Sequence, residues 1–235
     1  MDYKLLKAFE SLFVGQPYLH RNSTQGDYVA SFIVDDLRAL GRSPKLNVAV
    51  DTGDLVLNTA NKTVGLKHRR GDGTFGTIVP GETPSKISAY IVSIGEVANI
   101  HLGAEVKILA KAMIKQLDRV GSDMENQAQE FRKHGSEPIC VGIVAVNYAQ
   151  SYTSFEGERA WPTDGKKHKH PNQEAAAAEG RLLSRISGKF DEIVCLRFIA
   201  TNVEPFPFAW LDASETKKQY GAALVRISAY FERRL

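Results

Sequence analysis

The sequence from Ala104 to Val146 reads AEVKILAKAMIKQLDRVGSDMENQAQEFRKHGSEPICVGIVAV, and it decides the fold class. It begins with a short apolar strand at residues 104–108. The next apolar residues recur every three or four positions, which is the spacing of one face of an α-helix. They are Leu109, Met113, Leu117, Val120, Met124, Ala128 and Phe131. A second apolar strand follows at 139–146, and this order predicts an α/β fold with a mixed central sheet flanked by helices.

The flanking sequence adds elements of both kinds. Helices are predicted at 3–14, 27–40 and 173–186, and strands at 46–50, 55–57, 87–94, 96–100 and 192–200. A turn at 101–103 would join strand 96–100 to strand 104–108. Residues 62–80 combine strands and turns, and 226–233 is expected to close the domain. We therefore expect one domain over residues 1–235, with its core at about 27–200.

Composition excludes several classes of protein. With 43% hydrophobic and 24% charged residues, the chain has the composition of an ordinary globular protein. No apolar run approaches the roughly 18–20 residues needed to cross a bilayer, and the first residues do not resemble a signal peptide. We therefore expect a cytoplasmic protein that does not associate with a membrane. The two cysteines are too few for a structural zinc site.

Glu105-Val106-Lys107 is the segment most indicative of chemistry. Residues two apart on a strand point to the same face, so the carboxylate and the ammonium group would lie side by side. Phosphodiester hydrolysis needs acidic oxygens to hold Mg²⁺, and a lysine can orient the attacking water or stabilise the transition state. The alternative is an exposed ion pair at a sheet edge. Of the four acid-any-lysine patterns in the chain, only this one leads from an apolar strand into an amphipathic helix.

Residues 96–146 resemble the core of the PD-(D/E)XK nuclease superfamily, which includes many restriction endonucleases. That family has a first acidic residue, a short gap, a (D/E)-x-K strand, a helix and another buried strand. Glu105 and Lys107 match its strand, and Glu96 stands in the place of the first acid, although no Pro-Asp pair precedes it. The resemblance implies a restriction endonuclease-like core in which Glu96 and Glu105 bind Mg²⁺ (or Mn²⁺) and Lys107 acts on the water or the transition state.

The remaining metal ligand is left open by the sequence. Asp54 is the reserve candidate and Asp51 a further one, both near the end of an earlier predicted strand. The family also often places an acid on a preceding helix. Asp27, Asp35 or Asp36 would serve there.

Basic residues indicate two surfaces for DNA phosphates. Lys111, Lys115 and Arg119 would share one helix face, with Gln116 on nearby turns. The polar segment 147–172 combines aromatic residues with Lys166, Lys167 and Lys169, a pattern typical of nucleic-acid contact. Ordinary solvated faces are the alternative for both.

Two other patterns are rejected. Gly71-Asp72-Gly73-Thr74-Phe75-Gly76 fits a dinucleotide-binding pattern, but no helix follows it, so a hairpin turn is expected. Asp51-Thr52-Gly53 is similar to the loop of aspartic proteases, which need two such loops to share a proton. The resulting prediction is an Mg²⁺-dependent DNA endonuclease, and the resemblance implies an enzyme of restriction type that forms a homodimer. The alternatives are a catalytically inactive nucleic-acid-binding module of the same fold and, less favoured, an aspartic-protease-like dimer that uses Asp51.

Overall fold

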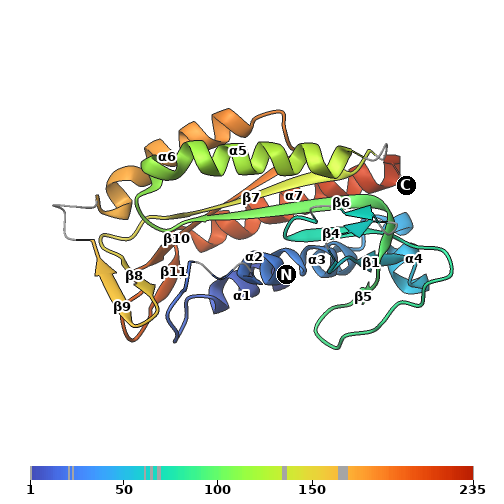
Figure 1. The fold of residues 1–235 in the computed structure, drawn as a ribbon, viewed down its shortest axis with the longest axis horizontal. Coiled ribbons are helices and arrows are strands. Elements are labelled where there is room, and N and C mark those ends of the chain that lie inside the picture. The colour runs from blue at the N-terminus through green and yellow to red at the C-terminus, as the bar shows by residue number, and fades with distance from the viewer. Residues whose placement is uncertain are drawn as a thin grey trace.

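The computed structural model describes residues 2–20, 22, 24–60, 62–63, 66–67, 70–133, 137–163 and 169–234. In this part of the chain, helices lie on both faces of a seven-stranded sheet with the order β11-β10-β7-β6-β4-β1-β5. Figure 1 shows α5 and α6 on one face of the sheet and α1 to α4 on the other. The predicted α/β class with a mixed, helix-flanked sheet is therefore confirmed.

The helices are α1 Lys4–Ser11, α2 Thr24–Ala30, α3 Ile33–Leu40, α4 Pro44–Thr52, α5 Met113–Arg132, α6 Pro171–Ile186 and α7 Ala213–Arg234. The strands are β1 Leu55–Leu57, β2 Lys62–Thr63, β3 Leu66–Lys67, β4 Gly73–Ile78, β5 Ser93–Ile94, β6 Val97–Leu109, β7 Ile139–Asn147, β8 Thr153–Glu156, β9 Arg159–Pro162, β10 Glu192–Ala200 and β11 Phe208–Trp210. β2 pairs with β3, and β8 pairs with β9, in separate two-stranded sheets.

The segment that decides the fold forms β6, α5 and β7. β6 and β7 are parallel, and α5 covers them with its apolar stripe, every residue of which is buried. α6 then leads to β10, which is parallel to β7. On the other face, the apolar core extends beyond residues 27–200, because Leu5 and Phe9 of α1 share it with Tyr220 and Phe231 of α7.

Several predicted elements differ from the structure. Residues 46–50 lie within α4, because the Ser43 hydroxyl accepts a hydrogen bond from the Leu46 N–H at 3.1 Å and Pro44 occupies the first turn. The predicted helix 27–40 is divided into α2 and α3, and only Ser93–Ile94 of segment 87–94 is a strand. The long segment after β7 contains the β8–β9 hairpin.

β6 is one continuous strand, so the predicted turn at 101–103 is wrong. Gly103 is paired on both sides, with Thr74 of β4 and Cys140 of β7, and the ring of Phe131 packs against it, so that a Cβ there would lie 2.5 Å from the ring. β6 pairs antiparallel with β4, and the register shifts between Phe75 and Gly76, where His101 is an extra residue on β6. A Cβ on Gly76 would lie 2.0 Å from the Asn99 carbonyl oxygen, so the irregular pairing requires glycine.

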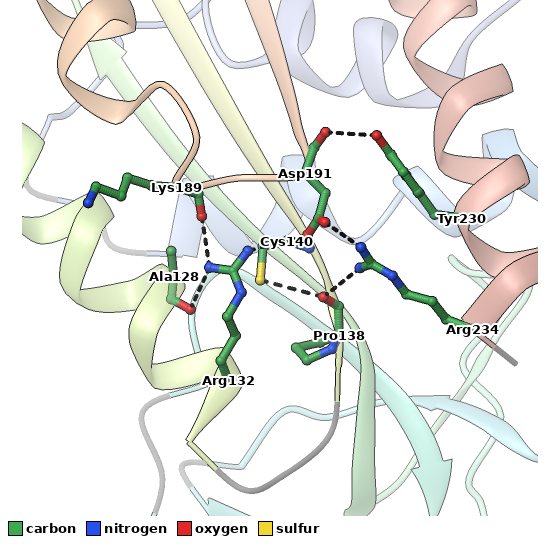
Figure 2. A network of polar contacts seen from close by, with 8 residues as sticks. All are labelled: Ala128, Arg132, Pro138, Cys140, Lys189, Asp191, Tyr230 and Arg234. Carbon is green, nitrogen blue, oxygen red and sulfur yellow. Dashed lines mark hydrogen bonds and ion pairs between the residues drawn. The ribbon is translucent and has the colours of Figure 1, made fainter.

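Asp191 organises a polar network where β7 and β10 begin (Figure 2). Its carboxylate accepts hydrogen bonds from the Cys140 N–H at 2.8 Å and from Arg234 at 2.6 Å, and Arg132 lies 3.4 Å away. Burial raises the pKa of Asp191, but these donors outweigh it, so its pKa lies below the ordinary value. The network attaches the carboxyl ends of α5 and α7 to the amino ends of strands β7 and β10.

No helix in the described ranges is both long and apolar enough to cross a membrane.

Candidate active site

The pairing of β4 with β6 brings two carboxylates together. Gly73 lies opposite Ala104 and Thr74 opposite Gly103, so the next residue outward, Asp72, lies beside Glu105. The Asp72 Oδ2 accepts a hydrogen bond from the Val106 N–H at 2.7 Å. The neighbouring helix α2 approaches closely through Gly26, where a Cβ would lie 2.7 Å from the Asp72 carboxylate. Asp72 is thus held between a helix and the central strand.

Glu105 and Lys107 lie on the same face of β6, as predicted. The Glu105 side chain is 3% exposed and accepts a hydrogen bond from the Lys107 Nζ at 2.6 Å. Val106, between them, belongs to the apolar core on the opposite face of the sheet. The pair is therefore not an exposed ion pair, because Glu105 is buried, although β4 pairs with β6 only as far as Ala104 and only β7 pairs with residues 105–107.

The electrostatic environment of Asp72 is unfavourable for its charged form. Burial, and next the negative charge of Glu105, raise the pKa of Asp72 to about 7. The Val106 N–H and the charge of Lys107 oppose this rise without cancelling it. Two carboxylates with one ammonium group leave excess negative charge in a partly desolvated place, which a divalent cation would neutralise.

These three side chains line a cleft of about 1040 Å³. Its walls include β6, the amino end of α2 with Asp27, the stretch of α5 from Gln116 to Gln127, and the β8–β9 hairpin with Trp161. The amino end of α5 is fixed by Glu174 of α6, which accepts a hydrogen bond from the Met113 N–H at 2.6 Å. The cleft is polar and carries both signs of charge.

No family model, curated protein or solved structure matches this chain. The interpretation of the cleft therefore depends on its own chemistry. In the part of the chain that the structure describes, no group of three or more His, Cys, Asp or Glu side chains is arranged to hold a metal ion.

The structure does not bring Glu96 to this site. We expected Glu96 and Glu105 on adjacent strands, but Glu96 precedes the single strand β6, whose stretch from Val97 to Glu105 spans about 26 Å at the usual rise of roughly 3.3 Å per residue. Asp54 precedes β1, whose first residue lies opposite Thr77, near the end of β4 remote from Asp72. Neither Glu96 nor Asp54 is among the described residues that line the cleft.

Of the three helical candidates, only Asp27 lies in the cleft, where it forms an ion pair with Arg70. Asp36 accepts hydrogen bonds from the Leu5 N–H and the Tyr220 hydroxyl, and Asp35 forms an ion pair with Lys4. These two residues therefore have structural roles.

Asp51 does not lie in a protease-like loop. It is exposed in the last turn of α4, where it forms an ion pair with Arg38 at 2.8 Å. The expected strand before the Asp-Thr-Gly sequence is a helix, so the physical basis for a protease-like interpretation is lost.

The predicted phosphate contacts are only partly in the cleft. Lys111, Gln116 and Arg119 line it. Lys111 precedes α5, and burial lowers the pKa of its amino group. Gln116 donates a hydrogen bond to the Lys111 carbonyl oxygen at 2.8 Å and accepts one from Arg119 at 3.3 Å. Lys115 is exposed and is not a lining residue.

The basic loop is described only in part. Lys166 and Lys167 lie outside the described residues, and Lys169 is exposed just before α6. Of the aromatic residues in this region, Tyr152 is buried, Tyr148 donates to Glu179 at 2.9 Å, and Trp161 lies on the cleft wall.

Asp72 is the site residue that sequence reasoning missed. It lies in the Gly71-Asp72-Gly73 segment, whose pattern predicts only a hairpin turn. A signal was present: an acidic residue at the start of a predicted strand, with glycines on both sides. Glycine there permits close approach, since a Cβ on Gly71 would lie 2.5 Å from Phe131 and one on Gly73 would lie 2.9 Å from Ala30.

Proposed function

We propose that this chain is an Mg²⁺-dependent endonuclease that hydrolyses DNA phosphodiester bonds, with a core like that of the PD-(D/E)XK nucleases. One observation carries the proposal: the β4–β6 register brings Asp72 beside Glu105, whose carboxylate accepts a 2.6 Å hydrogen bond from Lys107 in an open polar cleft. Asp72 takes the role that we expected for Glu96.

The donor set suits Mg²⁺ (or Mn²⁺). Mg²⁺ keeps several waters and is usually bound by one or two carboxylates together with substrate phosphates, so a cage of three protein ligands is not required. Burial, and next the negative charge of Glu105, raise the pKa of Asp72, and a bound cation would offset the repulsion between the two carboxylates. When bound, Mg²⁺ would lower the pKa of a coordinated water and neutralise charge on the phosphate.

The side chains of the cleft then have distinct roles. Asp72 and Glu105 would hold the ion, and the Val106 N–H fixes the orientation of Asp72. Lys107 holds Glu105 in place and carries a positive charge that stabilises the pentavalent transition state. Lys111 and Arg119, farther along the cleft, would bind phosphates on either side of the bond that is cut.

The test is cleavage of plasmid and linear DNA with and without Mg²⁺, by the wild type and by Asp72→Asn, Glu105→Gln and Lys107→Ala. We expect each of these variants to lose at least 100-fold in rate, because each removes a ligand or a transition-state charge. Matched controls are Glu96→Gln and Asp54→Asn, which change the same kinds of carboxylate outside the cleft and should cut normally.

Two results would change the assignment. Activity lost in Glu96→Gln and retained in Asp72→Asn would make Glu96, and not Asp72, the metal ligand. DNA binding without cleavage under any metal condition would favour the inactive nucleic-acid-binding module. Homodimer formation, which would allow both strands to be cut, is checked by sedimentation with and without DNA.

A further inference from the structure

The β8–β9 hairpin presents an exposed tryptophan to the cleft. The hairpin is separate from the central sheet, and Figure 1 shows it at one end of the molecule. Trp161 is 48% exposed and lines the cleft together with Ser154 and Glu156 of β8. The other tryptophan, Trp210, stacks on Phe9 at 5.5 Å and is packed against the core. Only Trp161 therefore offers an indole ring to a ligand in the cleft.

The position of Trp161 is coupled to the proposed phosphate site. The Lys111 Nζ donates a hydrogen bond to the Trp161 carbonyl oxygen at 3.3 Å. Lys111 lies in the short connection that follows Glu105 and Lys107 of β6. The hairpin is thus attached to the segment that leaves the proposed active site, and Arg119 supplies a further positive charge in the same cleft.

An exposed aromatic ring beside phosphate-binding cations is the arrangement that binds single-stranded nucleic acid, because bases stack on the ring while cations follow the backbone. In a continuous duplex each base is covered by its neighbours and has no free face. A ring in this position can stack only on a base that is unpaired, terminal or extruded.

We propose that Trp161 stacks on an unpaired base of the DNA substrate, so that the preferred substrate carries single-stranded nucleotides next to the bond that is cut. This inference rests on the proposed nuclease function for the identity of the ligand, and it specifies the class of DNA. Overhangs, flaps and single strands would be bound in preference to blunt duplex.

The experiment uses the fluorescence of Trp161 in a Trp210→Phe variant, in which it is the sole tryptophan. The protein is titrated in EDTA with an oligo-dT strand and with a relaxed circular DNA duplex, which has neither loops nor ends. We expect the single strand to quench the fluorescence and the circular duplex to leave it nearly unchanged. In the Trp210-containing protein, Trp161→Ala should weaken single-strand binding by about tenfold or more, and Trp161→Phe should retain most of it.

The matched control is Val225→Ala on α7, which removes a similarly exposed (47%) apolar side chain outside the cleft. It should bind DNA normally. Equal quenching by both DNAs, or unchanged binding by Trp161→Ala, would overturn the inference, as would a stronger response to oligo-U RNA. Because binding is measured without metal, single-strand quenching with no cleavage in Mg²⁺ would refute the nuclease and not the stacking. Cleavage without quenching would refute the stacking alone.

Discussion

Replacing Asp72 with asparagine should make the metal-free protein more stable while abolishing its proposed activity. Asparagine keeps an oxygen that can accept the Val106 N–H but removes one of two adjacent negative charges. The pKa of Asp72 rises from 3.8 to about 7, through burial and then through Glu105. A rise of this size corresponds to an upper limit of about 4 kcal/mol for keeping Asp72 ionised. Partial exposure and water should reduce the gain in free energy of unfolding to roughly 1–3 kcal/mol.

The effect must depend on pH in one direction. A carboxyl whose pKa is raised on folding does not lower the free energy of unfolding well below pH 3.8, where it is protonated in both the folded and the unfolded state. The wild type loses stability as the pH rises from about 4 to 7, and above that the full cost remains. The advantage of Asp72→Asn should therefore be about a third of its full size at pH 5 and largest at pH 8.

The assay is chemical and thermal unfolding in EDTA at both pH values, with Asp54→Asn as an exposed carboxylate control. For a chain of this size, 1 kcal/mol corresponds to roughly 2–4 °C in Tm. Adding Mg²⁺ at pH 8 should stabilise the wild type and leave Asp72→Asn unchanged. An Asp72→Asn variant that is less stable than the wild type at pH 8, or equally stabilised at both pH values, would refute the electrostatic account of this site.

Three further results are expected. Lys107→Ala should retain DNA binding in titrations while cleavage falls at least 100-fold, since it removes a transition-state charge; near-normal cleavage would show that Lys107 is not a site residue. Lys111→Ala should lower the log-log salt slope of DNA binding by about 0.9, and an unchanged slope would exclude a phosphate contact. Asp191→Ala should cost about 2–4 kcal/mol in denaturant unfolding at pH 7, because it leaves the Cys140 N–H without its acceptor. Asp191→Asn should cost less, and since the pKa of Asp191 is lowered by folding, the loss in Asp191→Ala should shrink as the pH falls.

Local patterns predicted the parts of the fold that depend on local spacing. The apolar stripe from Leu109 to Phe131 marked α5 correctly, except that Leu109 itself ends β6. The apolar runs of β7 and β10 were placed within a residue. In α4, Val48 and Val50 favour a strand, whereas the capping by Ser43 and Pro44 determines the outcome.

The site was harder to predict because it depends on pairing between distant segments. Glu105 and Lys107 are two residues apart, so strand geometry alone placed them together. Asp72 reaches Glu105 only through the register of β4 against β6, and residues 79–96 intervene between these strands. Proximity in the sequence favoured Glu96, which the continuous strand β6 places far from Glu105.

The bulge at His101 in β6 allows the pairing of β4 with β6 to adjust locally. Regular pairing of residues 73–75 with residues 102–104 sets the alignment of Asp72 with Glu105, and both register shifts lie on the far side of that pairing. A change in length within the connection 79–96 would first displace residues 76–78 of β4, where the pairing with β6 is irregular. The bulge can take up that displacement by local twisting. An insertion or deletion in this connection therefore need not change the distance between Asp72 and Glu105. The end of the sheet remote from the cleft can vary while the site keeps its geometry.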